Sequence, residues 1–142
     1  MISSFLTEDH QRCDHLFAEA ERRVSEGDWT GAREAFEATR DATLRHFRME
    51  EEVFFPRFEE TTGMTMGPTQ VMRQEHVQMR DLFERMAQAL EEEDVDAYLG
   101  DSETLLVLMQ QHNAKEEQIL YPMLDSHLQD SETLIAQARA LA

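Results

Sequence analysis

The chain has 142 residues, a length typical of one domain and sufficient to bury a hydrophobic core. Its 13 lysine and arginine residues against 30 acidic residues give a formal net charge of −17. This charge argues against nucleic acid or an anionic membrane as a partner, because both are bound by positive surfaces. No segment approaches the roughly 20 consecutive apolar residues that a membrane-spanning helix requires.

Apolar residues recur at helical spacing in four long segments, which predicts an all-α four-helix bundle. The helices are expected at about 4–26, 28–58, 68–92 and 94–127, followed by a short amphipathic C-terminal helix at 131–141. Ser4 is expected to cap the first helix, and Pro68 suits the first turn of the third. Short connections predict two antiparallel hairpins, at about 4–60 and 68–127, in a single domain of residues 1–142.

The start of the chain and its cysteine content predict a cytoplasmic protein. Residues 1–8 lack the basic segment and following apolar run of a signal peptide. Cys13 is the one cysteine and cannot form an internal disulfide, so the fold is not expected to depend on an oxidising compartment.

Four of the six histidines are related by a single shift along the chain. The shift places His10 on His76 and His46 on His112, so the two histidines have the same spacing in each half. The same shift superimposes Asp9 on Glu75, Asp28 on Asp94, Glu50-Glu51 on Glu116-Glu117, and Pro56 on Pro122. We therefore interpret the chain as two duplicated helical hairpins, each carrying a histidine followed by His-x-x-x-Glu.

The repeated pattern predicts a metal site inside the bundle. Residues four apart in an α-helix differ by about 40° around the axis and about 6 Å along it, so His46 and Glu50 point to one place. Together the halves supply four imidazoles and two carboxylates, a set that suits two divalent transition-metal ions. The candidate metal ligands are His10, His46, Glu50, His76, His112 and Glu116.

A single His-x-x-x-Glu on so acidic a chain would more often be a surface ion pair, whereas two in matched frames favour metal binding. Glu51, Glu52 and Glu117 are rotated away from the histidines that they follow, so the sequence assigns them to solvated faces. His15 and His127 fall outside the pattern and are interpreted as ordinary polar residues.

These motifs resemble the signature of the hemerythrin-like, His-His-Glu cation-binding domains. The resemblance rests on His10, His46-Phe-Arg-Met-Glu50, Phe54-Phe55-Pro56, His76, His112-Asn-Ala-Lys-Glu116 and Leu120-Tyr121-Pro122. It covers essentially the whole chain and implies an up-down-up-down bundle around two iron ions joined by an oxo or hydroxo bridge. In that scheme Glu50 and Glu116 bridge the irons, and the four repeat-related histidines are terminal ligands.

The chain departs from the oxygen-carrying members at two positions. They have a further histidine one turn after the third-helix histidine, where this chain has Arg80, and an Asp five residues after the last histidine, where Glu116 stands at four. The missing imidazole implies an open or water-filled position on one iron, which favours reaction with oxygen, nitric oxide or peroxide. An ion pair between Arg80 and Asp14, its repeat-related position, is a further expectation.

The second repeat has Tyr121 where the first has Phe55. This phenol could lie near one iron, but a surface or helix-end position is the preferred interpretation. Pro56 and Pro122 are each expected to kink or end a helix.

The sequence leaves three functions open. The first is a protein that binds or senses a small diatomic ligand, oxygen or nitric oxide, with a separate protein partner for any signal. The second is a stress protein that consumes peroxide or supports the repair of iron centres. The third is a bundle that holds another divalent metal, such as zinc or manganese, in a structural role, or that holds no metal.

Overall fold

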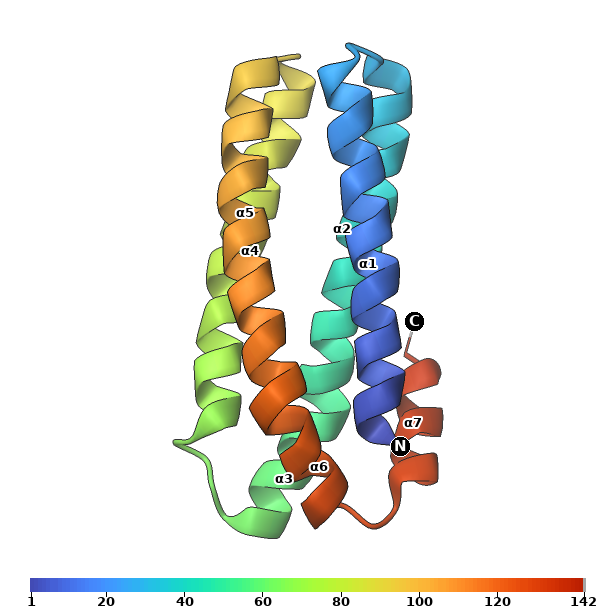
Figure 1. Cartoon of the computed structure of the whole chain (residues 1–142), viewed down its shortest axis with the longest axis vertical. Helices are drawn as coiled ribbons and strands as arrows, with labels where there is room; N and C mark the ends of the chain where they lie inside the picture. The colour runs from blue at the N-terminus through green and yellow to red at the C-terminus, as the bar shows by residue number, and fades with distance from the viewer. Residues whose placement is uncertain (142) are drawn as a thin grey trace.

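The computed structural model describes residues 1–141, and within that range every regular element is a helix, which confirms the predicted all-α class. Four long helices lie side by side (Figure 1): α1 (Ile2–Ser25), α2 (Trp29–Met49), α4 (Pro68–Glu91) and α5 (Val95–Lys115). Two π-helical turns, η1 (Glu50–Phe54) and η2 (Glu116–Leu120), extend α2 and α5 into α3 (Phe55–Thr62) and α6 (Tyr121–His127). The last helix, α7 (Ser131–Arg139), folds back beside α1.

The starts of α2 and α5 are fixed by equivalent capping residues. The side chains of Asp28 and Asp94 accept hydrogen bonds from the backbone N–H groups of Gly31 and Ala97. Each bond satisfies one of the N–H groups that the first turn of a helix leaves unpaired. The predicted starts at 28 and 94 therefore agree with the structure to within one residue.

The start of α1 differs from the prediction. The helix begins at Ile2, and the Ser4 hydroxyl donates to the carbonyl of Met1, so Ser4 is not the N-cap. Instead, Asp125 of α6 accepts hydrogen bonds from the backbone N–H groups of Ile2 and Ser3. A residue distant in the chain thus caps this helix, which local sequence could not indicate.

The two π turns begin at the repeat-related residues Glu50 and Glu116. The expected end of the second helix at Phe58 is wrong, because the chain stays helical through Pro56 to Thr62. A proline lacks a backbone N–H and crowds the preceding turn. Here a wider π turn precedes each proline, so the helix continues. Such turns are rare and often occur at functional sites.

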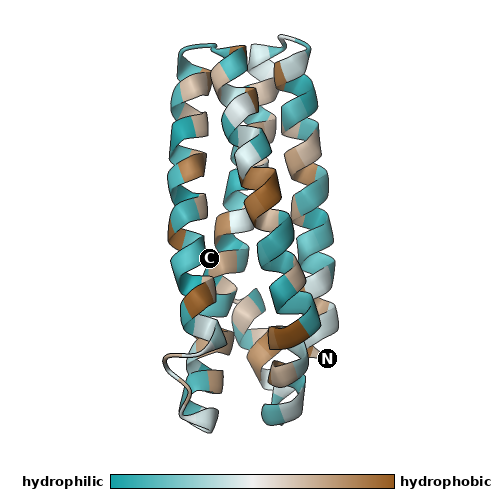
Figure 2. Ribbon diagram, turned by 60° about the vertical axis from the view of Figure 1, so that its left-hand side comes forward, coloured by the Kyte–Doolittle hydropathy of each residue, from teal (hydrophilic) through white to brown (hydrophobic). Residues whose placement is uncertain are grey.

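The hydrophobic core has two clusters, one on each side of a buried polar layer. One cluster includes Leu6, Phe54, Phe58 and Leu124, and α7 joins it through Leu134. The other lies between the long helices toward their opposite ends and consists of Ala20, Val24, Ala32, Phe36, Phe47, Met79, Leu82, Phe83, Met86, Ala89, Leu90, Tyr98 and Leu105. The outer faces of the helices are largely hydrophilic (Figure 2). Within residues 1–141, no helix combines the length and the apolar content needed to cross a bilayer.

Candidate metal centre

The structure brings all six predicted site residues together in the polar layer between the two core clusters. Each of the four long helices supplies one histidine, and each π turn begins with one glutamate. All six side chains are buried, with exposures between 0 and 4%: His10, His46, Glu50, His76, His112 and Glu116.

The six residues form two groups that share both carboxylates. His10 and His46 belong to the first group and His76 and His112 to the second, and in each the candidate ligand atoms lie within 4.8 Å of one another. One oxygen of Glu50 lies 3.4 Å from His46 Nε2, and the other lies 3.1 Å from His76 Nε2. Glu50 therefore faces both groups.

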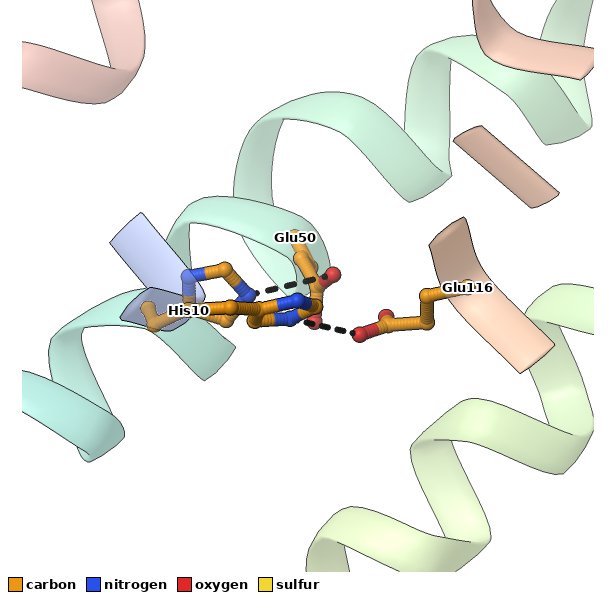
Figure 3. Close-up of side chains that lie close together, drawn as sticks. His10, Glu50 and Glu116 are labelled. Carbon is orange, nitrogen blue, oxygen red and sulfur yellow. Dashed lines mark hydrogen bonds and ion pairs between the residues drawn. The ribbon is translucent and has the colours of Figure 1, made fainter. Parts of the chain in front are cut away.

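Glu116 completes both groups from the opposite side of the layer. Its Oε1 atom lies 3.1 Å from His10 Nε2 and 3.2 Å from His112 Nε2. Figure 3 shows Glu50 and Glu116 reaching toward the imidazoles from different elements. All four Nε2 atoms thus face the interior of the layer, beside carboxylate oxygens.

On the outer side, the Nδ1 atom of every site histidine contacts a second carboxylate. We call these four residues the outer carboxylates: Asp9 on His46 at 2.8 Å, Glu51 on His76 at 2.6 Å, Glu75 on His112 at 2.8 Å and Glu117 on His10 at 2.6 Å. An ionised carboxylate only accepts hydrogen bonds, so Nδ1 carries the proton. A neutral imidazole held in this way presents its Nε2 lone pair to the interior, as a metal ligand must.

The outer carboxylates were not among the site residues predicted from the sequence. Glu51 and Glu117 were expected on solvated faces because they are rotated away from the histidine that precedes each of them. That rotation brings each of them to the histidine of a neighbouring helix, whose Nδ1 atom faces the perimeter of the bundle. The sequence does contain a signal for these four carboxylates. The shift that superimposes the site histidines also relates Glu51 to Glu117 and Asp9 to Glu75.

The expected ion pair between Arg80 and Asp14 is wrong. The Arg80 guanidinium donates two hydrogen bonds to Glu51, at 2.8 and 2.9 Å, and lies 5.4 Å from the centre of the Phe47 ring. Helix α4, which carries Arg80, packs against α2 and α5, whereas α1, which carries Asp14, packs against α2, α5, α6 and α7. Arg80 therefore supports the outer carboxylate of His76.

Charges of opposite sign balance one another in this layer. Burial lowers the pKa of His112, but the adjacent charge of Glu116 outweighs this effect and raises it to about 9. Burial likewise opposes the charged forms of His46 and Glu50, yet their mutual attraction raises the histidine pKa and lowers the glutamate pKa. Binding of a cation requires neutral imidazoles, so it would release protons and be favoured by higher pH.

The side chains fit two cations, one in each group. Imidazole nitrogens and carboxylate oxygens suit divalent first-row metals. Among the described residues, the buried atoms Glu50 Oε1, His76 Nε2, His112 Nε2 and Glu116 Oε2 make no hydrogen bond, although the first two lie 3.1 Å apart. Native proteins rarely leave buried polar atoms unpaired, and a bound cation would satisfy all four.

Tyr121 is the first residue of α6, but its side chain lies at the centre of the layer, which contradicts its assignment to the surface. The side chain is fully buried, and its hydroxyl donates to Glu50 Oε2 at 2.6 Å. The backbone N–H of Tyr121 bonds to the carbonyl of Glu116 across the π turn. Burial and the adjacent charges of Glu116 and Glu50 raise the pKa of the phenol well above its usual value.

A narrow cavity of about 20 Å³ adjoins the first group only. Its lining residues come from α1, α2 and α5: His10, Cys13, Asp14, Phe17, Thr43, His46, Phe47, Leu106, Met109 and Asn113. The lining is mostly apolar, and it includes exposed Asp14, so the cavity reaches the surface. This volume accommodates about one water-sized molecule.

The fold and the site define an all-helical protein with buried histidine and glutamate groups able to hold metal cations. Residues 1–124 match the sequence model of the family described as hemerythrin HHE cation binding domain, and the chain belongs to this family. The match contains all six site residues and stops before α7. Comparisons with curated proteins and with solved structures gave no match.

Proposed function

We propose that the protein holds two iron ions joined by an oxo or hydroxo bridge, and that this centre binds or senses a small diatomic ligand, oxygen or nitric oxide. Glu50 and Glu116 would bridge the irons, and the four site histidines would be terminal ligands. Iron in such a centre supplies redox activity and coordination of a diatomic molecule. The cavity beside His10 and His46 is the observation that carries the proposal.

The cavity suits a diatomic molecule in size and in chemistry. At about 20 Å³ it accommodates a molecule near the size of water. Phe17, Leu106 and Met109 provide apolar walls, which favour an uncharged gas over ions. Within the described residues, the side-chain oxygen of Asn113 is buried without a hydrogen-bond partner, so the lining also holds one unpaired hydrogen-bond acceptor.

The second group is enclosed by aromatic rings instead. The Phe47 ring stacks on His76 at 4.0 Å between centroids with an interplanar angle of 14°. Phe55 lies parallel to the same imidazole at 6.1 Å and 16°. Neither His76 nor His112 lines the cavity. These contacts support entry of the ligand at the first group.

The test compares two substitutions on α5. Met109→Trp fills the cavity, whereas Val107→Trp, two residues away at an exposed position, is the matched control. Stopped-flow mixing of the reduced, iron-loaded proteins with nitric oxide or oxygen measures association. We expect Met109→Trp to slow association about tenfold or more, and the control to match the wild type.

Three results would overturn the proposal or redirect it. An absence of any reversible spectral change with either gas excludes diatomic ligand binding. Catalytic loss of added peroxide that disappears in His112→Ala favours the stress-protein alternative. Stoichiometric zinc or manganese in protein expressed without added metal favours the structural alternative.

We also propose an arrangement of the helices, an origin by duplication and a cellular location for this protein. The ascending and descending order of the long helices in Figure 1 supports an up-down-up-down four-helix bundle in one domain. The internal repeat that relates His10 to His76 supports its origin from two duplicated hairpins. We further propose that the protein is cytoplasmic and that a protein partner relays any signal from the site.

A further inference from the structure

The hydroxyl of Tyr121 lies close to every member of the first group. The distances from its oxygen are 3.0 Å to His10 Nε2, 3.2 Å to His46 Nε2, 2.6 Å to Glu50 Oε2 and 3.0 Å to Glu116 Oε1. No part of this side chain is exposed. The phenol oxygen is therefore surrounded by the same atoms that would surround a cation.

These distances match the spacing of neighbouring ligands on one metal ion. Metal–nitrogen and metal–oxygen bonds of about 2.0–2.2 Å place two ligands at a right angle roughly 3 Å apart. The phenol oxygen has this spacing from both imidazoles and from Glu116. It thus has the position of a ligand that shares an ion with them.

Hydrogen bonding alone does not account for these contacts. The phenol hydroxyl has a single proton to donate. Glu50 and Glu116, in their ionised forms, accept hydrogen bonds and have no proton to donate. When Glu50 receives the proton, Glu116 Oε1 is left 3.0 Å from the phenol oxygen with no proton between them. A shared cation resolves this conflict, because it attracts both oxygens.

We propose that Tyr121, as a phenolate, is a fifth protein ligand of the metal ion in the first group. The phenol O–H bond breaks as the metal–oxygen bond forms, and the proton leaves with those displaced from the histidines. This inference rests on the proposed iron centre and adds a ligand to the six residues inferred from the sequence.

The second group has no such ligand. Its repeat-related residue is Phe55, which has no heteroatom and stacks on His76. The two metal positions are therefore chemically different. Together with the proposed bridge, the phenolate would bring the ligands of the first metal to six, so a diatomic molecule that enters from the cavity would have to displace Tyr121 to bind there.

The experiment compares ferric, iron-loaded wild type with Tyr121→Phe by visible absorption, resonance Raman spectroscopy and iron content. The wild type should show a phenolate-to-iron charge-transfer band and phenolate vibrations. Tyr121→Phe should lose both and retain two irons per chain, one for each group. Tyr98→Phe is the matched control, because Tyr98 is the other tyrosine and packs against Phe36 in the distant core cluster.

A retained band and vibrations in Tyr121→Phe would overturn the assignment and leave the iron centre intact.

If the wild type holds no iron, the proposed function fails, and cobalt(II) loading of the same two proteins decides the role of Tyr121. Cobalt ligand-field bands report coordination number, so identical spectra refute ligation and altered bands support it. If Tyr121→Phe does not fold, iron-loaded Tyr98→Phe decides, because Tyr121 is then the one tyrosine in the chain. Phenolate vibrations in that variant support coordination by Tyr121, and their absence refutes it.

Discussion

Replacing Glu51 by glutamine is expected to weaken metal binding while all six proposed ligands remain. Glu51 Oε2 lies 2.6 Å from His76 Nδ1, and the carboxylate accepts two hydrogen bonds from Arg80. Glutamine preserves the size and one accepting oxygen but removes the charge. His76 then becomes a less basic ligand, and Arg80 loses its ionic partner.

Loss of a group that orients a ligating histidine typically costs 10–100-fold in metal affinity, which corresponds to about 1.4–2.8 kcal/mol. Glu51 should lie near the upper end of this range. Burial raises its pKa, but hydrogen bonds from His76 and Arg80 outweigh burial and hold the pKa at about 2. Glu117→Gln should cost less, because the Glu117 side chain is 37% exposed against 19% for Glu51, and water screens its charge.

The assay is competition for metal with a chromophoric chelator, together with elemental analysis and circular dichroism of each variant. Glu52→Gln is the matched control, because this adjacent side chain is 49% exposed and pairs with Arg48 at 3.0 Å. We expect its affinity to stay within about twofold of the wild type. Equal affinities for folded Glu51→Gln and Glu52→Gln would refute the role of the outer carboxylates.

Three further predictions concern the ligand, the fold and pH. Tyr121→Phe should bind nitric oxide faster than the wild type in stopped-flow mixing, because no phenolate has to be displaced; an unchanged rate would count against displacement. Leu134→Ala removes a buried contact of α7 and should cost about 2–4 kcal/mol, seen in calorimetry as a melting temperature lower by on the order of 10 °C. The His112 pKa is raised from 6.5 to about 9 in the folded protein, so its stabilisation is complete below pH 6.5 and is lost as pH rises through 9. Urea unfolding of metal-free protein should show this decline, and a flat profile would contradict it.

The six inner site residues could be predicted because their signal is local and repeated. The four-residue spacing of His46 and Glu50 fixes their common direction on any α-helix, and His112 and Glu116 repeat that spacing in the second half. The caps at Asp28 and Asp94 depend equally on local sequence. The order of helices and the inner site therefore required little knowledge of packing.

The burial of Tyr121 beside Glu116 could not be predicted in this way, because it depends on a π turn rather than on α-helical spacing. In an α-helix, residues five apart differ by about 140° around the axis, which would turn Tyr121 away from the side of Glu116. The π turn instead bonds the Tyr121 N–H to the Glu116 carbonyl, and this pairing of residues five apart brings them to nearly the same side. The contacts of Glu51 and Arg80 were missed for a different reason, since they depend on which helices are neighbours.

Neither half of the chain contains a complete metal group. The first group takes three side chains from the first half and Glu116 from the second, and the second group takes Glu50 in return. Two outer contacts, Glu51 with His76 and Glu117 with His10, also cross the seam between the halves. Bound cations would therefore hold the two halves of the chain together. Their removal should first weaken the packing of one half against the other, while the individual helices remain helical.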